Sequence, residues 1–220
     1  REAERALGKL RAWALALIGD HRGGIDAAEL ASGPYDPEGA TLLARLAALA
    51  LRRQDREAAE RALILSLRAD PRPLERRLDL AALQIARGRS EAAIQGLRTA
   101  LASTESPALE RALAGALLAS GRAAEATRRL AQRLERCPEP IRCHLDLARA
   151  ALEAGELRLA QFAARRAHAL AENDSEPLTL LGLALAREGQ RQEARRAFER
   201  ALQRAPGEAR ARAGLRGLEP

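Results

Sequence analysis

The stretch that decides the fold runs from Ser175 to Pro206 and reads SEPLTLLGLALAREGQRQEARRAFERALQRAP. Its apolar and small residues recur at helical spacing in two stripes, which are Leu178, Leu181, Gly182 and Leu185, then Ala194, Phe198 and Ala201. Gly189 separates the stripes, and Pro206 closes the second one because proline cannot continue a helix. The stretch therefore predicts two helices joined by one short turn.

In order and spacing this unit resembles a tetratricopeptide repeat, a helix–turn–helix unit of about 34 residues that occurs in tandem arrays. The same spacing continues upstream. Gly189 lies 34 residues after Gly155, Gly155 lies 34 after Gly121, and Gly121 lies 33 after Gly88. One step further upstream, Gln54 stands where the next turn glycine is expected. The rival solenoid families have longer periods or a β-turn signature that this chain lacks.

This register predicts an array of five repeats, at about 40–73, 74–106, 107–140, 141–174 and 175–208. Residues 209–220 predict a short Arg-rich helix, either a cap or the start of a truncated repeat. The native chain is therefore expected to extend beyond residues 1–220, with any leader missing from this sequence.

Residues 1–39 predict a degenerate, capping helix pair without the repeat signature. A first helix reaches Ile18, and Asp26 with Glu29 resembles a capping box that opens a short second helix. Asp36 and Pro37 are the expected N-cap and first residue of the helix that follows.

Composition supports an all-α fold. The 220 residues are 47% hydrophobic but only 2% aromatic, and strong β-formers are scarce. The net charge is +7, with 37 basic residues that are nearly all arginine, which indicates a high-GC, bacterial source. The 30 acidic residues are interspersed among them, so nucleic acid is an unlikely partner, and no apolar run long enough to span a membrane is present.

The resemblance implies a right-handed superhelical solenoid whose first helices line a concave groove. It also implies that ligands contact four or five positions on each first helix. In this sequence the predicted groove residues are Ala48, Leu51, Arg52, Leu78, Ala82, Ile85, Arg111, Gly115, Leu118, Arg142, Leu145, Arg149, Leu152 and Leu183.

These groove residues are mostly apolar, with arginines spaced among them. That pattern suits an amphipathic helix or a Leu-rich peptide that carries acidic residues. The Lys and Asn residues with which some family members clamp a carboxylate are absent, because Ala44, Ala48, Leu78 and Ala82 occupy those positions. The alternative is that the groove side chains simply pack against one another, or against the helix that carries Trp13.

The second helices of the repeats predict a basic outer surface, made of Arg68, Arg98, Arg128, Arg129, Arg165, Arg166, Arg195 and Arg196. Two interpretations stay open. The arginines form a solvated face with intrahelical glutamate pairs, or they contact an acidic partner, an anionic surface or RNA.

The two cysteines, Cys137 and Cys143, flank a short loop between two repeats. We expect free, half-buried thiols; the alternative is a disulfide, which would indicate an oxidising compartment. The three histidines and two cysteines lack the spacing of a metal site, and no catalytic arrangement or cofactor motif is readable, so neither an enzyme nor a cofactor is expected.

The sequence thus predicts a protein–protein interaction scaffold. High-GC bacterial relatives suggest envelope, pilus, secretion or polysaccharide-export assembly. A basic surface that binds nucleic acid or an anionic surface, and the regulatory repeats of a larger multidomain protein, are the alternatives. A cytoplasmic and a periplasmic or outer-membrane-associated location both fit.

Overall fold

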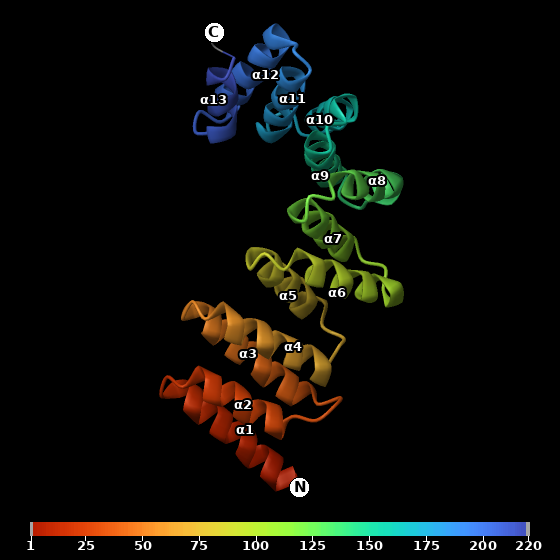
Figure 1. Ribbon diagram of the computed structural model, residues 1–220. Helices are drawn as coiled ribbons and strands as arrows, with labels where there is room; N and C mark the ends of the chain where they lie inside the picture. Colours follow the sequence, from red (N-terminus) through yellow and green to blue (C-terminus); the bar gives the residue numbers. More distant parts are fainter. Residues whose placement is uncertain (1, 219–220) are drawn as a thin grey trace. The chain divides into compact units, whose positions relative to one another are not determined.

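The computed structural model describes residues 2–218, and the regular structure of these residues is entirely helical (Figure 1). The chain forms two compact units, Arg1–Thr104 and Glu105–Pro220. The first unit contains α1 (Glu2–Leu17), α2 (His21–Ala31), α3 (Pro37–Arg52), α4 (Arg56–Ala69), α5 (Leu74–Ala86) and α6 (Ser90–Ser103). Each odd-numbered helix pairs with the helix that follows it.

The second unit repeats this arrangement. Its helices are α7 (Pro107–Ala119), α8 (Ala123–Arg133), α9 (Pro140–Glu153), α10 (Leu157–Leu170), α11 (Glu176–Arg187), α12 (Arg191–Arg204) and α13 (Ala209–Arg216), and a 3-10 turn, η1 (Leu134–Arg136), follows α8. The short α13 packs on α11 and α12. In both units the first helix of each hairpin is an odd-numbered helix, and the second is even-numbered.

The same local geometry closes all six helical hairpins. The turn residue has a positive φ, between 62° and 103°, at Gly19, Gln54, Gly88, Gly121, Gly155 and Gly189. The next residue donates its backbone N–H to a carbonyl five residues back, as from Asp55 to Ala50 and from Gln190 to Leu185, both at 2.9 Å. These bonds satisfy carbonyls that the helix end would leave unpaired. Gln54 is the one turn residue of the six that is not glycine, as its place in the register predicted.

The second helix of the N-terminal pair begins earlier than predicted. Helix α2 begins at His21, and its N-cap is Asp20, whose carboxylate accepts from the Gly23 N–H at 2.8 Å. The predicted start at Asp26 was wrong, because the glycines before it are helical. Gly24 lies so close to α1 that an added Cβ would stand 2.8 Å from the Ala12 carbonyl oxygen. The prediction for α3 is confirmed, since Asp36 is its N-cap and Pro37 its first residue.

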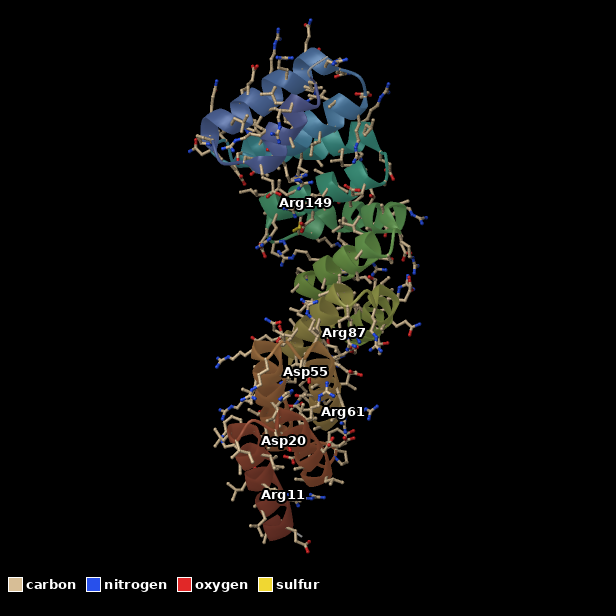
Figure 2. All side chains as sticks on the ribbon, turned by 60° about the vertical axis from the view of Figure 1, so that its left-hand side comes forward. Arg11, Asp20, Asp55, Arg61, Arg87 and Arg149 are labelled. Carbon is tan, nitrogen blue, oxygen red and sulfur yellow. A yellow bond between two sulfur atoms is a disulfide. The ribbon has the colours of Figure 1, made fainter. Side chains whose placement is uncertain are left out.

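Asp55 shows how neighbouring hairpins of the first unit are joined (Figure 2). It caps α4 by accepting from the Ala58 N–H at 3.1 Å. Its other oxygen lies 2.7 Å from Arg22 Nε and 2.9 Å from His21 Nε2, both on α2. The hydrogen bond from Arg22, followed by that from His21, holds the pKa of the Asp55 carboxyl well below its usual range.

A buried carboxylate makes a second junction, between α4 and α5. Glu60 is 2% exposed. It accepts hydrogen bonds from Gln84 at 3.3 Å, from Arg89 at 2.9 Å and from Arg87, which Figure 2 labels. A buried charge is tolerated only with such partners. Gln161 stands at the same repeat position in the second unit, and it donates to Glu188 of the following hairpin.

The one fully buried aromatic ring in the described residues fixes α13 onto the last hairpin. Phe198 is 0% exposed. Its ring fills the space that side chains at Gly182 on α11 and Gly214 on α13 would need, since an added Cβ would lie 2.6 Å and 2.4 Å from the ring atoms. The ring therefore requires both glycines, and it packs α13 against α11 and α12.

Candidate functional site

Most of the predicted groove residues of the first unit are exposed, and none is buried. On α3, Ala48, Leu51 and Arg52 are exposed, and Leu51 keeps 43% of its surface. On α5, the predicted residues are the exposed Ala82 and the half-buried Leu78 and Ile85. Each of these residues lies on the first helix of a hairpin. Together they give a mostly apolar face with a guanidinium at one end.

Helix α1 extends this face, although its sequence lacks the repeat signature and predicted no groove residues. Trp13 is 38% exposed, Leu10 is 66% exposed and Leu17 is 72% exposed. Between α1 and α3 lies a groove of about 570 Å³, lined by Lys9, Leu10, Trp13, Pro37, Glu38, Thr41, Leu42 and Arg45. We call the exposed surface of α1, α3 and α5 the apolar face.

The spacing of the turn residues could have predicted that α1 is the first helix of a repeat-like hairpin. Gly19 precedes Gln54 by 35 residues, which is one more than the usual repeat length. Counting from this turn places Trp13 opposite Ala48 on the next first helix. A helix pair that lacks the consensus residues can therefore still contribute to the apolar face, because the turn sets its register.

Charged residues also belong to the helices and loops around the apolar face. Lys9 Nζ lies 2.9 Å from Asp36 and 3.3 Å from Glu38. Partial burial lowers the pKa of Lys9, but the hydrogen bonds to these two carboxylates outweigh it and leave the pKa above its usual value. Arg45 and Arg52 are exposed, and the described residues give neither of them a carboxylate partner. The two free guanidinium groups are available to an acidic ligand.

The predicted groove residues of the second unit lie in a different environment. Leu145 is 7% exposed and Leu152 is 2% exposed, and both belong to a core cluster with helices α10 and α11. Leu118 and Leu183 are half-buried, and Gly115 is exposed. The leucines that would line a groove here mostly pack inside the unit.

The arginines predicted for this groove are already paired. Arg149 (Figure 2) donates to Asp146 at 3.0 Å and to Glu176 at 3.1 Å. Arg111 and Arg142 lie 3.5 Å and 3.6 Å from Glu139. Burial raises the pKa of the Asp146 carboxyl, and the arginines around it oppose that shift only in part. This face of the second unit satisfies its own charges, so the first unit holds the better site.

Helix α8 departs from the repeat pattern. Glu110 and Arg133 occupy the positions that Leu178 and Ala201 hold two repeats later. Glu110 is 9% exposed, and it accepts from Arg129 at 3.2 Å and from Arg133. Helix α8 has 11 residues, whereas α10 has 14, and η1 replaces its last turn. A pocket of about 220 Å³ lies beside this ion pair.

A disulfide between Cys137 and Cys143 forms part of the wall of this pocket. The expectation of free thiols was therefore wrong. The loop between α8 and α9 reverses the chain over six residues and brings the two sulfur atoms together, which spacing alone left undecided. Among residues 2–218 no cluster of three or more His, Cys, Asp or Glu side chains is arranged to hold a metal ion, and no helix is long and apolar enough to cross a membrane.

Comparison with known proteins agrees with the hairpin geometry. Residues 175–208 match the family model of the tetratricopeptide repeat. Helical hairpins of the same kind make up the structure on both sides of that match. The chain therefore contains a tetratricopeptide repeat and has the fold of tetratricopeptide-repeat proteins.

Solved structures with this fold match most of the chain. PilW, described as a widely conserved type IV pilus biogenesis factor, has a TM-score of 0.67 at 18% identity, and the match covers 96% of this chain and 98% of PilW. YrrB, described as a tetratricopeptide-repeat protein with an unusual peptide-binding site, has a TM-score of 0.62 at 16% identity over 80% of this chain and 92% of YrrB. A thermophilic tetratricopeptide-repeat protein from Thermus thermophilus has a TM-score of 0.61 at 21% identity over 81% of this chain and 98% of its own. A search of curated proteins gave no match by sequence.

Proposed function

We propose that this tetratricopeptide-repeat protein is a non-enzymatic scaffold whose first unit binds a peptide or helix of a partner protein. The observation that carries the proposal is the exposure of Trp13, Leu17 and Leu51 on adjacent first helices. Proteins seldom leave several large apolar side chains exposed on adjacent helices unless a partner covers them. The fold is one that commonly serves protein binding, and the chain has no readable catalytic arrangement.

The chemistry of the apolar face defines the ligand. Its centre is apolar, so the partner segment supplies Leu-like or aromatic side chains at helical or extended spacing. Arg45 and Arg52 lie free at its border and pair with carboxylates, which bind guanidinium groups in a bidentate manner. The ligand is therefore an apolar segment flanked by acidic residues.

The setting of this binding is the finer part of the proposal. We place it in the assembly of a multiprotein complex in the bacterial envelope, and pilus biogenesis is the most specific candidate. The support is the shared fold with PilW over nearly the whole of both chains. Deleting the gene in its source bacterium and scoring pilus assembly tests this setting separately from peptide binding.

Peptide binding can be measured with the single tryptophan of the protein. Peptides selected from a displayed random library are titrated against the purified protein, and Trp13 emission is followed. Because Trp13 lines the groove, a peptide that covers it will shift the emission to shorter wavelength. Among the selected peptides we expect apolar residues next to Asp or Glu.

A matched pair of variants locates the site. Leu17→Glu with Leu51→Glu places charges in the apolar face and should weaken binding by tenfold or more. Leu30→Glu changes another exposed leucine of the same unit, 89% exposed on α2, and should bind like the native protein. Selected peptides that bind both variants equally would place the site elsewhere and refute the proposal.

A further inference from the structure

The second unit has a strongly uneven charge distribution between its two sets of helices. The second helices α8, α10 and α12 carry three, three and five arginines, eleven in all, against Glu125, Glu193 and Glu199. The first helices α7, α9 and α11 carry four arginines and four carboxylates. The positive charge of this unit is therefore concentrated on its second helices.

Much of this charge is unpaired. Within residues 2–218 the structure gives no carboxylate partner to Arg128, Arg165, Arg166, Arg195 or Arg196, and all five are exposed. Helix α10 contains no acidic residue. A face that served only to keep the protein in solution would pair such arginines with glutamates along the helix, which is one of the two interpretations that the sequence left open. The unpaired arginines favour the other interpretation, contact with an acidic partner.

An exposed aromatic ring lies at the centre of this basic face. Phe162 on α10 is 48% exposed. The Arg166 guanidinium carbon lies 5.6 Å from the ring centroid, and the His144 ring meets Phe162 edge-on with 6.5 Å between centroids. These contacts fix the orientation of the ring and leave about half of the side chain open to a ligand.

Arginines occupy the repeat and helix positions that neighbour Phe162. Arg128 on α8 lies 34 residues before Phe162, and Arg196 on α12 lies 34 residues after it, so the three share one position on successive second helices. Arg158 precedes the ring by one helical turn, and Arg165 follows it by one turn. The His168–Arg200 contact, at 3.4 Å, joins α10 to α12.

A hollow opens beside the ring. Its volume is about 530 Å³, and it is lined by Arg158, Gln161, Phe162, Arg165, Arg166, Glu188 and Gln190. The hollow and the single ring that lines it can accommodate one side chain of a ligand. Single-stranded nucleic acid needs a series of stacking platforms, and the other aromatic residue of this unit, Phe198, is buried. A flat lipid surface would leave the hollow unfilled.

We propose that this outer face of the second unit, made of Arg128, Arg158, Phe162, Arg165, Arg166 and Arg196, binds an acidic polypeptide segment. The segment inserts one apolar or aromatic side chain into the hollow against the Phe162 ring. Its carboxylates pair with the arginines around the hollow. This face is separate from the apolar face of the first unit, so a scaffold of this kind holds two different protein segments at once.

The test compares two short fluorescein-labelled peptides by fluorescence anisotropy at physiological salt, with the full chain. Both consist of alternating Glu and Asp; one has a central Phe, and the other has Ala in its place. We expect the Phe peptide to bind at least tenfold more tightly than the Ala peptide. Phe162→Ala should reduce that ratio to about one, and Phe162→Leu should keep part of it.

Charge variants and competing ligands complete the test. Arg165→Glu with Arg166→Glu should abolish binding of the Phe peptide, whereas Arg68→Glu on α4 of the first unit should leave it unchanged. The far-ultraviolet circular dichroism of each variant verifies folding. Absent binding of the Phe peptide, or equal binding of the two peptides, would overturn the proposal. Preferential, Phe162-dependent binding of oligothymidylate, or of phosphatidylglycerol vesicles, would overturn it in favour of those ligands.

Discussion

Gln54 lies in a turn whose five counterparts are all glycine, and this makes the substitution Gln54→Gly informative. The residue has a φ of +62°, in the left-handed region that favours glycine. A side-chain-bearing residue costs about 1–2 kcal/mol there. Glycine removes that cost, but it also raises the conformational entropy of the unfolded chain, which lowers the stability of the folded protein by about 0.4–1 kcal/mol. The net expectation is a stabilisation of about 0.5–1 kcal/mol.

The reverse substitution supplies a matched control within the same unit. Gly88 has a φ of +74°, and an added Cβ would meet no atom within 4 Å. Gly88→Gln therefore adds backbone strain without a steric clash, and it should destabilise the protein by about the same 0.5–1 kcal/mol. The double variant should return to within about 0.5 kcal/mol of the native protein if the turns act independently.

Urea denaturation followed by Trp13 fluorescence measures the first unit, since Trp13 belongs to α1. Thermal unfolding should move by about 2–4 °C for each kcal/mol in a chain of this length. The reasoning is refuted if Gln54→Gly is neutral or destabilising, or if Gly88→Gln is tolerated at no cost. Either result would mean that contacts of the Gln54 side chain, rather than backbone conformation, decide the stability of these turns.

Three further predictions concern buried charge, the disulfide and acid stability. Glu60→Ala leaves the guanidinium groups of Arg87 and Arg89 without their carboxylate and should lower the free energy of unfolding in urea by about 3 kcal/mol. Gln161→Ala, at the same repeat position, should lower it by about 1 kcal/mol. Equal losses for the two variants would contradict the role given to the buried charge. Replacing Cys137 and Cys143 by serine removes a cross-link between residues six apart and should lower the free energy of unfolding by about 2 kcal/mol, from the entropy of loop closure. Mass spectrometry of the non-reduced native protein should give a mass two hydrogens below that of the reduced chain. The mass of the reduced chain would contradict the cross-link. The pKa of Asp55 is lowered in the folded state, so its contribution to stability is complete above about pH 4 and is lost as the pH falls further. Asp55→Asn keeps a helix cap and should reduce the loss of unfolding free energy that the native protein shows on acidification. If that loss is unchanged in the variant, other carboxyl groups cause it.

The fold was predictable because it depends on backbone requirements that leave a clear trace in the sequence. Glycines at a regular spacing mark left-handed turns, and the Asp36–Pro37 pair marks a helix start. The start of α2 was missed because Gly23 and Gly24 look like helix breakers. Gly24 allows α2 to pack closely on α1, and Gly23 leaves room for the Asp20 carboxylate that caps α2; only the structure reveals these two roles.

The candidate site was less predictable, because the register gives positions but not exposure. Leu51 and Leu152 share one repeat position, yet Leu51 is 43% exposed and Leu152 is 2% exposed. The difference comes from the neighbouring helices. Leu152 packs in a core cluster with residues of α10 and α11, and Arg149, one turn before it, is paired with Asp146 and Glu176. In the first unit the exposed Ala48 holds the repeat position of Arg149. The packing of the neighbouring helices, which the register does not give, thus decides which part of a predicted groove stays accessible.

The closed geometry of the hairpin turns has a consequence for how such a chain evolves. Each chain reversal is completed by backbone bonds among a few consecutive residues, such as the bond from Gln190 to Leu185. A duplication of one repeat length of coding sequence therefore inserts a hairpin that already contains its own reversal. The chain can gain or lose whole hairpins in one genetic step, and selection then acts on the helix faces, where each copy can acquire its own exposed residues, as α10 has with Phe162.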